Sequence, residues 1–339
     1  MTTLVTGAAG FVGLNVVEHL LRAGRDVVGL DRIEIPDRAR RLFPTLPGRF
    51  TAVSGTVLSA ADLSRALAAA PVRAVIHCAV ITAGSARERD DPEGIVAVNV
   101  QGAVATLAAA ARRGVARFVY PSSVAVYGAA ARGVPLVRED EVPARPAMLY
   151  GLTKLACETL LPRVAEVGGL TFAAARLASV YGPWEYATGA RDTLSPMLSA
   201  LHHAAAGTEA ILSTPGLGDF VYARDAAAGL AALADAPALR HTVYNLGSGE
   251  VSSAAHWCRT LAGLVPGFRW RLARDGEDSN TVSHVAFDRG ALDVTRLAAD
   301  TGWAPRFGMA AAASDDLAWE MPPRQPAGDG NGREPTGRG

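Results

Sequence analysis

Three residues in the middle of the chain have the types and the spacing to perform proton chemistry. Tyr150 and Lys154 are four residues apart in Tyr150-Gly-Leu-Thr-Lys154, and residues at this spacing share one face of a helix. A cation beside a phenol favours the phenolate, which can exchange a proton with a hydroxyl or a carbonyl near neutral pH. Ser123, which follows an apolar run, could donate a hydrogen bond to the reacting oxygen. Taken alone, the Tyr/Lys spacing also fits an ordinary surface helix, and the serine could cap local backbone.

A glycine-rich turn near the N-terminus favours the chemical interpretation. Gly7, Gly10 and Gly13 lie between a short apolar strand and an amphipathic helix. Glycines let the backbone turn sharply and approach a ligand, and amide groups at a helix N-terminus bind phosphate. Asp31, after the second apolar run, can accept the ribose hydroxyls of an adenosine and would repel a 2′-phosphate, which favours NAD over NADP. Arg32 beside it weakens this preference, because an arginine can pair with a phosphate.

The elements that must position these residues alternate between strands and helices. Apolar runs predict strands at 4–5, 26–30, 50–53, 74–78, 117–120 and 170–177, and helical patterns begin at Phe11 and cover 60–69, 92–113 and 150–167. This alternation predicts an α/β fold with a doubly wound parallel sheet. The carboxyl ends of such strands meet at one edge, which would gather Gly7, Asp31, Ala79, Ser123 and Ser179. Residues 32–47, rich in Arg and Pro, are expected to form a loop.

The chain is expected to divide into two folded parts and a tail. Residues 1–177 would form a dinucleotide-binding Rossmann domain. Residues 178–320, with helices near 194–207 and 224–234, would form a smaller substrate-binding part, and a strand at 242–246 would return to the main sheet. Residues 322–339 have almost no apolar side chain and are expected to be disordered.

The composition of the 339-residue chain argues against several classes of partner. Its net charge is zero, which favours neither nucleic acid nor an anionic membrane, and no uncharged stretch approaches the ~20 residues of a membrane span. The basic run at 38–41 lacks interleaved aromatics and is interpreted as solvated surface. The three scattered cysteines and the His202-His203 pair lack metal-ligand spacing, so no metal is expected. With no signal peptide before the first strand, a cytoplasmic location is expected.

These pieces, in this order, resemble the NAD-dependent epimerase/dehydratase family of extended short-chain dehydrogenase/reductases, which includes UDP-glucose 4-epimerase. The resemblance covers roughly residues 1 to 310. The matching motifs are Thr6-Gly-Ala-Ala-Gly-Phe-Val-Gly13, Asp31, His77-Cys-Ala79, Asn99-Val-Gln-Gly102, Ser122-Ser-Val-Ala-Val-Tyr-Gly128, Tyr150-Gly-Leu-Thr-Lys154, Arg176-Leu-Ala-Ser-Val-Tyr-Gly-Pro183 and Gly218-Asp-Phe-Val-Tyr-Ala-Arg-Asp225.

The resemblance implies a role for each matching residue. Tyr150 would be the acid/base, Lys154 would tune it and bind the nicotinamide ribose, and Ser123 would be the catalytic serine. Asp31 would bind the adenine ribose of NAD, with Arg32, Thr56 and Val57 nearby. Helices 92–113 and 149–168 would pair with a second subunit as a four-helix bundle, making a homodimer. The pyrophosphate would lie on Gly7, Gly10, Phe11, Val12 and Gly13, and Ala79 and Asn99 would line the cofactor groove.

Several departures from the family pattern bear on the ligands. Thr56-Val57 stands where the family often has an acid that contacts adenine, and Ser179 stands where nucleotide-sugar enzymes have an asparagine near the diphosphate. No acid follows Ser123, which excludes a dehydratase. Arg191, in an unusual stretch at 184–192, could clamp a carboxylate or a phosphate, or pair with Asp192 or Glu185 on the surface.

The sequence therefore predicts an NAD-dependent epimerase or oxidoreductase that acts on a hydroxyl group of a sugar or nucleotide sugar by hydride transfer. An alternative is an NAD-dependent dehydrogenase or reductase of a non-nucleotide sugar, a sugar acid or another small hydroxy or keto compound. A third is a catalytically silent NAD-binding regulator on the same fold. The presence of Ser123, Tyr150 and Lys154 together favours an enzyme. The identity of the substrate stays open.

Overall fold

The centre of the protein is a seven-stranded sheet in which every strand pairs in parallel. We use a computed structural model, which describes residues 1–190, 192, 194–281 and 287–321; Arg191 and the tail at 322–339 lie outside these residues. The order of the sheet is β11-β7-β5-β4-β1-β2-β3. Its strands are β1 (Thr2–Thr6), β2 (Asp26–Asp31), β3 (Phe50–Ser54), β4 (Val72–His77), β5 (Arg117–Ser123), β7 (Thr171–Leu177) and β11 (Val243–Leu246). The predicted doubly wound α/β fold is confirmed.

Alternate residues along each strand build two separate cores, one on each face of the sheet. On β1, Leu4 joins one core and Val5 the other, and Val75 and Ile76 divide in the same way on β4, as the two-residue period of a strand requires. The first face is covered by α3 (Ala60–Ala68), α6 (Gly102–Arg112) and α7 (Leu149–Gly168), and the second by α1 (Phe11–Arg22), α9 (Ala223–Asp235) and α11 (Thr295–Thr301). Helices on both faces explain why the strands are apolar throughout.

The helix predicted at 92–113 contains an irregular turn in its middle. It starts as α5 (Pro92–Val96), where the Asp91 side chain accepts a hydrogen bond from Gly94 N, and reaches α6 through a π-helical turn at Ala97–Gln101. The span Pro92–Arg112 is one helix, among the described residues, that is long and apolar enough to cross a membrane. It packs against α3 and α7, which is the position of a core helix.

The structure corrects two expectations for the Arg- and Pro-rich segment at 32–47. This segment is not only a loop, because α2 (Asp37–Leu42) and a 3-10 turn (Phe43–Thr45) form there. Burial of Phe43 and an ion pair between Arg40 and Asp37 account for the short helix. Arg38 is not solvated surface either. Its guanidinium lies 3.4 Å from the centroid of the Trp319 ring and donates a hydrogen bond to the Trp319 carbonyl.

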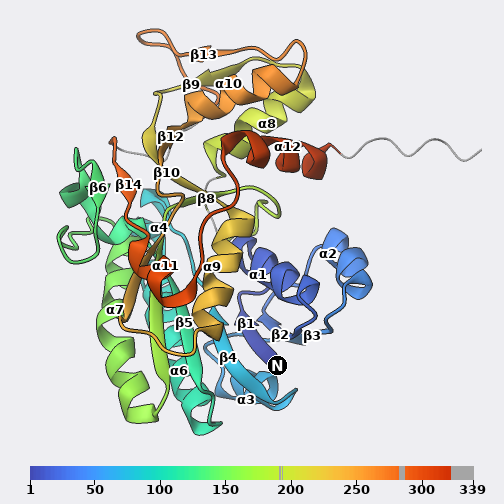
Figure 1. Cartoon of the computed structure of the whole chain (residues 1–339), viewed down its shortest axis with the longest axis vertical. Coiled ribbons are helices and arrows are strands. Elements are labelled where there is room, and N and C mark those ends of the chain that lie inside the picture. Colours follow the sequence, from blue (N-terminus) through green and yellow to red (C-terminus); the bar gives the residue numbers. More distant parts are fainter. Residues whose placement is uncertain (191, 193, 282–286, 322–339) are drawn as a thin grey trace, which may run out of the picture.

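A smaller part of the protein stands over the carboxyl edge of the large sheet (Figure 1). The chain enters it after β7 and returns to the large sheet through α9 and β11, and β11 pairs in parallel with β7. The smaller part contains a three-stranded sheet of β8 (Ser179–Tyr181), β10 (Leu217–Tyr222) and β12 (Val251–Ser253), a pair of β9 (Ala210–Leu212) and β13 (Trp270–Leu272), and the helices α8 (Pro196–Ala206), α10 (Ala254–Leu264) and α12 (Met309–Glu320). The short α4 (Ser85–Asp90) and the bridge of β6 (Leu136–Val137) with β14 (Ala291–Leu292) complete the described elements.

A buried carboxyl on α12 is under electrostatic stress. Asp316 is 1% exposed, and its Oδ1 atom has no hydrogen-bond partner among the described residues. Burial and the nearby carboxylates of Glu320, Glu185 and Asp315 raise the pKa of Asp316 to about 8, against a smaller opposing effect of Arg224. An unfolded aspartate titrates near pH ~4. Between these two values the folded state holds the extra proton, so ionisation of Asp316 lowers stability as the pH rises from about 4 to 8.

We expect Asp316→Asn to stabilise the protein, by about 1 kcal/mol or more at pH 8 and less at pH 5, because the amide removes a buried charge. Thermal unfolding across pH 5–9 measures this as a rise in Tm of at least ~2 °C at the alkaline end. The matched control is Asp315→Asn. It should destabilise, because Asp315 accepts hydrogen bonds from Tyr222 and Arg224. A Tm difference for Asp316→Asn that does not change with pH would contradict the assignment.

Candidate functional site

A cavity of about 720 Å³ lies at the carboxyl edge of the large sheet and collects most of the predicted site residues. It opens where the strand order reverses, between β1 and β4, which is the usual ligand position in such sheets. Asn99 lies behind the cavity wall instead of lining it, and Arg191 is outside the described residues. The predicted residues that line the cavity are Gly7, Gly10, Phe11, Val12, Gly13, Asp31, Arg32, Thr56, Val57, Ala79, Ser123, Tyr150, Lys154 and Ser179.

The turn between β1 and α1 fits a dinucleotide pyrophosphate. Gly7 has a φ of +66°, and a Cβ atom placed on it would lie 2.6 Å from Ala79 N at the end of β4. A Cβ atom on Gly13 would lie 1.9 Å from the Gly7 carbonyl oxygen. No side-chain cap is found for the first turn of α1 within the described part of the chain, and the amide groups at such a helix N-terminus can bind an anion. The turn therefore requires glycine at these positions and presents backbone donors to the cavity.

Asp31 and Thr56 form the end of the cavity expected to hold the adenosine. Asp31 Oδ2 accepts a hydrogen bond from Ala9 N at 2.9 Å, and Oδ1 accepts one from Ile33 N at 3.2 Å. The carboxylate is thus fixed to the glycine turn and retains lone pairs for two hydroxyl donors. The Thr56 amide donates to Asp62 Oδ2 at 2.9 Å, which places an acid one layer behind the Thr56-Val57 pair.

Ser123, Tyr150 and Lys154 reach the same cavity from two elements. Ser123 is the last residue of β5, and its hydroxyl oxygen accepts a hydrogen bond from Ala125 N at 3.1 Å. Tyr150 lies in the first turn of α7, and Lys154 one turn later. The Lys154 ammonium is buried, donates to the Pro121 carbonyl at 2.6 Å and lies 5.7 Å from the centroid of the Tyr150 ring. The cation is therefore close to the phenol, as the four-residue spacing predicts.

Two of the titratable groups near Lys154, His77 and Cys78, are neutral at neutral pH. Burial and the nearby Lys154 lower the pKa of His77 to about 3, and its Nδ1 atom is 2.9 Å from Thr6 Oγ1. Burial raises the pKa of the Cys78 thiol to about 12, so this cysteine is not a nucleophile at neutral pH. Lys154 is therefore the one described cation beside Tyr150 in the cavity wall.

The unusual stretch after Pro183 forms a strap along the cavity, defined here as residues 183–190. On α1, the Asn15 amide donates to the Pro183 carbonyl at 2.7 Å, and Glu18 Oε2 accepts from Trp184 Nε1 at 2.5 Å. Trp184 has a φ of +68°, a strained conformation that these contacts enforce. The Tyr186 hydroxyl then donates to the Ala9 carbonyl of the glycine turn at 2.5 Å.

The far end of the strap is attached to the loop after β4. The Ala190 carbonyl accepts from Thr82 N at 2.8 Å, and the Gly189 carbonyl accepts from Arg87 at 2.7 Å. Tyr186, Thr188 and Ala190 all line the cavity. The strap thus joins the glycine turn to the opposite wall. Sequence reasoning noted this stretch as unusual but had no signal for its contacts.

Arg289 is a cavity residue that sequence reasoning missed. It lines the same cavity as Ser179, Ser195 and Phe220. No hydrogen bond to its guanidinium is found within the described part of the chain. It precedes β14, in a region without strong periodicity or a motif. Nothing in the local sequence marks it as a ligand-binding residue.

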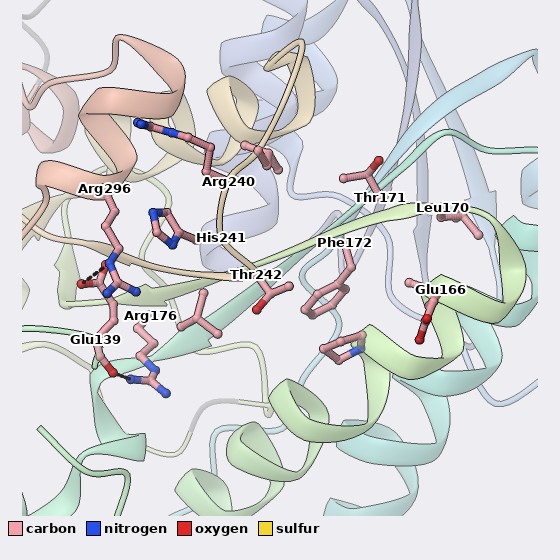
Figure 2. A pocket seen from close by; sticks show the side chains of 14 residues that line it. Glu139, Glu166, Leu170, Thr171, Phe172, Arg176, Arg240, His241, Thr242 and Arg296 are labelled. Carbon is pink, nitrogen blue, oxygen red and sulfur yellow. Dashed lines mark hydrogen bonds and ion pairs between the residues drawn. The ribbon is translucent and has the colours of Figure 1, made fainter. Parts of the chain in front are cut away.

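A second cavity, of about 740 Å³, lies at the β7–β11 edge of the sheet and contains none of the predicted site residues (Figure 2). Its charged groups are already paired within the protein. Arg296 is 2.5 Å from Asp140, Arg240 is 2.5 Å from Asp300, and Arg176 is bound to Glu158. Figure 2 shows Arg176 beside Glu139 at one side of this cavity. The chemistry therefore belongs to the first cavity.

Comparisons with known proteins identify a family and several relatives of this chain. The profile of the NAD dependent epimerase/dehydratase family matches residues 3–247. A UDP-glucose 4-epimerase of Mycolicibacterium smegmatis is 30% identical over 313 residues, 91% of this chain and 95% of that protein. UDP-glucuronate 4-epimerase 3 of Arabidopsis thaliana is 34% identical over 189 residues, 54% of this chain and 43% of that protein. The structure of MoeE5 in complex with UDP-glucuronic acid and NAD is 26% identical, covers 94% of this chain and 99% of that chain, and has a TM-score of 0.73.

The cofactor of this chain is NAD, as the sequence predicts, and the glycine turn and Asp31 fit it. Burial and the nearby Asp31 raise the pKa of Tyr186 to about 12, so its hydroxyl stays protonated and donates to the turn. We expect Tyr186→Phe to raise the Kd for NAD about 3- to 10-fold, the effect of one lost hydrogen bond on the segment that covers the cofactor. Calorimetric titration measures it.

The control for this variant is Tyr244→Phe, which also removes a buried tyrosine hydroxyl but acts on Asp300, far from the turn. Its Kd for NAD should equal that of the wild type. An unchanged Kd in Tyr186→Phe, or an equal rise in both variants, would show that the strap does not hold the cofactor.

Proposed function

Because the chain belongs to the NAD-dependent epimerase/dehydratase family and is an NAD-dependent enzyme, we propose that it is a nucleotide-sugar epimerase with a Ser123–Tyr150–Lys154 site. The observation that carries the proposal is the position of Tyr150, with Lys154 beside it, in the cavity that also contains the glycine turn. The relatives that act on UDP-glucose and UDP-glucuronate support this substrate class. The assay described below distinguishes between these two substrates.

Each residue of the site has a chemical task in this proposal. Tyr150 accepts the proton of the reacting hydroxyl while the carbon beneath it is oxidised, and returns a proton when that carbon is reduced from its other face. Lys154 holds a positive charge beside the phenol, and Ser123 donates a hydrogen bond to the reacting oxygen. NAD, when bound, supplies the hydride acceptor and donor. Because the hydride returns to the same substrate, no net NADH accumulates.

The end of the cavity at Arg289 is suited to the diphosphate of a nucleotide sugar. An arginine can bind two phosphate oxygens at once, and Ser179 lines the same cavity. Ser179 stands where related enzymes carry an asparagine, so Arg289 supplies the charge that this end of the site needs. We propose that Arg289 binds the substrate phosphate and takes no part in proton transfer.

The test is turnover of UDP-glucose, UDP-galactose and their uronic acid counterparts, followed by NMR of the sugar and by NADH absorbance. We expect interconversion at C4 without net NADH. Tyr150→Phe should lower kcat by on the order of 10²–10⁴-fold and leave NAD binding intact, whereas Arg289→Ala should act mainly on KM. Stoichiometric NADH release on a free sugar would indicate a dehydrogenase instead. NAD binding without turnover of any sugar, or full activity in Tyr150→Phe, would contradict the proposal.

We also propose that two copies of the chain associate through α5 and α7. Four large apolar side chains on these helices, Val96, Leu152, Leu160 and Val167, are between 39% and 72% exposed, and a second copy would cover them in a four-helix bundle.

The three cysteines are free, which fits a cytoplasmic location, where thiols remain reduced.

Light scattering tests the dimer. The double variant Leu152→Glu/Leu160→Glu should elute as a monomer of half the wild-type mass, because four buried charges per dimer would have to lose their hydration. Leu264→Glu, at a similarly exposed leucine on α10, is the matched control and should remain a dimer. A monomeric wild type would exclude this assembly.

A further inference from the structure

Helix α7 presents three ionisable side chains in a line, and the proposed mechanism uses only two of them. Tyr150, Lys154 and Glu158 follow one another at four-residue spacing and so share one face of the helix. Glu158 is buried and does not line the cofactor cavity. Its Oε1 atom accepts a hydrogen bond of 2.6 Å from the hydroxyl of Ser122, the residue before Ser123.

Two successive turns of α7 thus hold two successive residues of β5. Lys154 donates to the Pro121 carbonyl at 2.6 Å, and one turn later Glu158 accepts from Ser122 at the same distance. Pro121 and Ser122 are the last residues of β5 before Ser123. The contacts therefore fix the end of the strand that carries the serine against the helix that carries the tyrosine and the lysine.

The Glu158 carboxylate is itself held in place by an arginine from a third element. Arg176 on β7 donates to Oε1 from Nε at 3.0 Å and to Oε2 from Nη2 at 2.7 Å. Both side chains are buried, and the Arg176 guanidinium also lies 4.6 Å from the centroid of the Tyr127 ring. On its other side Arg176 borders the second cavity (Figure 2). A buried ion pair with this geometry has little freedom to move, so it is a rigid anchor for Ser122.

We infer that Ser122 and Glu158 are positioning residues for the reaction, acting through Ser123 and Lys154. The inference rests on the proposed function. The Ser122 hydroxyl is directed at Glu158 and takes no part in proton transfer, but it sets the distance from the β5 end to α7. Small displacements of reacting groups are costly, because rate depends steeply on their alignment. Without the Ser122 bond, Pro121 also loses its fixed position, and the Lys154 ammonium that it binds moves relative to the Tyr150 phenol.

The variant Ser122→Ala separates positioning from stability. It leaves the Glu158–Arg176 bonds in place and removes the one hydrogen bond from Ser122 to Glu158. We expect kcat to fall ~10-fold, the KM for the nucleotide sugar and the Kd for NAD to stay within about twofold, and Ser122→Thr, which restores the hydroxyl, to recover most of the rate. The control is Thr106→Val, which removes a buried hydroxyl bond to the Gly102 carbonyl in α6 and should keep the wild-type kcat.

A second measurement does not depend on turnover. The measurement is a pH titration of the NAD-bound protein, followed by tyrosinate absorbance. The part of this absorbance that is lost in Tyr150→Phe belongs to the Tyr150 phenol. Its midpoint should move to higher pH in Ser122→Ala, because the ammonium is less well placed, and should not move in Thr106→Val.

The outcomes separate the two claims. An inactive wild type would refute the proposed epimerase, while the absorbance would still decide the positioning role. Wild-type kcat together with an unmoved midpoint in Ser122→Ala would overturn the inference. Equal losses of kcat in Ser122→Ala and Thr106→Val would show that Ser122 contributes to stability alone.

Discussion

Where β1 leads into α1, Gly7 and Gly13 have no room for a side chain, and the rest of the molecule is arranged around that constraint. Gly7 touches the backbone at the end of β4, and Gly13 touches Gly7. This close approach seats α1 on the sheet with its uncapped N-terminus at the cavity. The same helix carries Asn15 and Glu18, which hold the start of the strap. One short stretch of backbone therefore sets both the cofactor cradle and one wall of the substrate cavity.

The proposed catalytic groups depend on a second arrangement, between β5, α7 and β7. The sheet brings the end of β5 to the cavity, and α7 crosses over it so that Tyr150 and Lys154 face Ser123. Neither element could hold the geometry alone, because the lysine is anchored on the strand and the strand on Glu158. The polar cluster around Glu158 and Arg176 thus positions the proposed catalytic groups, as the glycine contacts position the cofactor. The difference is that it uses buried charge, which must be completely paired to be tolerated.

What could be predicted from the sequence was what local pattern determines. The apolar strands, the glycine turn, Asp31 and the Tyr150–Lys154 spacing are readable because each depends on neighbours within a few residues. Tyr186 and the Ser122–Glu158 contact could not be predicted, since their partners lie 36 or more residues away. Arg289 could not be predicted because it lines the cavity from a segment without a motif. Asn99 belongs to a family motif, yet its side chain binds the Ile81 backbone and Thr153. This position of the Asn99 side chain depends on the π-helical turn, which no residue pattern in the sequence predicts. The helix α2 was not predicted, because the Arg and Pro residues of this segment suggested a loop. It forms because Phe43, directly after it, is buried in the core.

The aromatic side chains around Trp184 determine how a ligand can enter. Phe50, Phe43, Trp184 and Trp319 follow one another in edge-to-face contacts with centroid distances of 4.6–5.9 Å, and Arg38 stacks on the last ring. This row connects the outermost strand of the large sheet with the C-terminal helix of the smaller part. A hinge motion that swung the two parts away from each other would have to separate Phe43 from Trp184 and expose Glu18. Opening the cavity by local motion of the loop beside Thr82 and Ala190 would leave these contacts between the two parts intact.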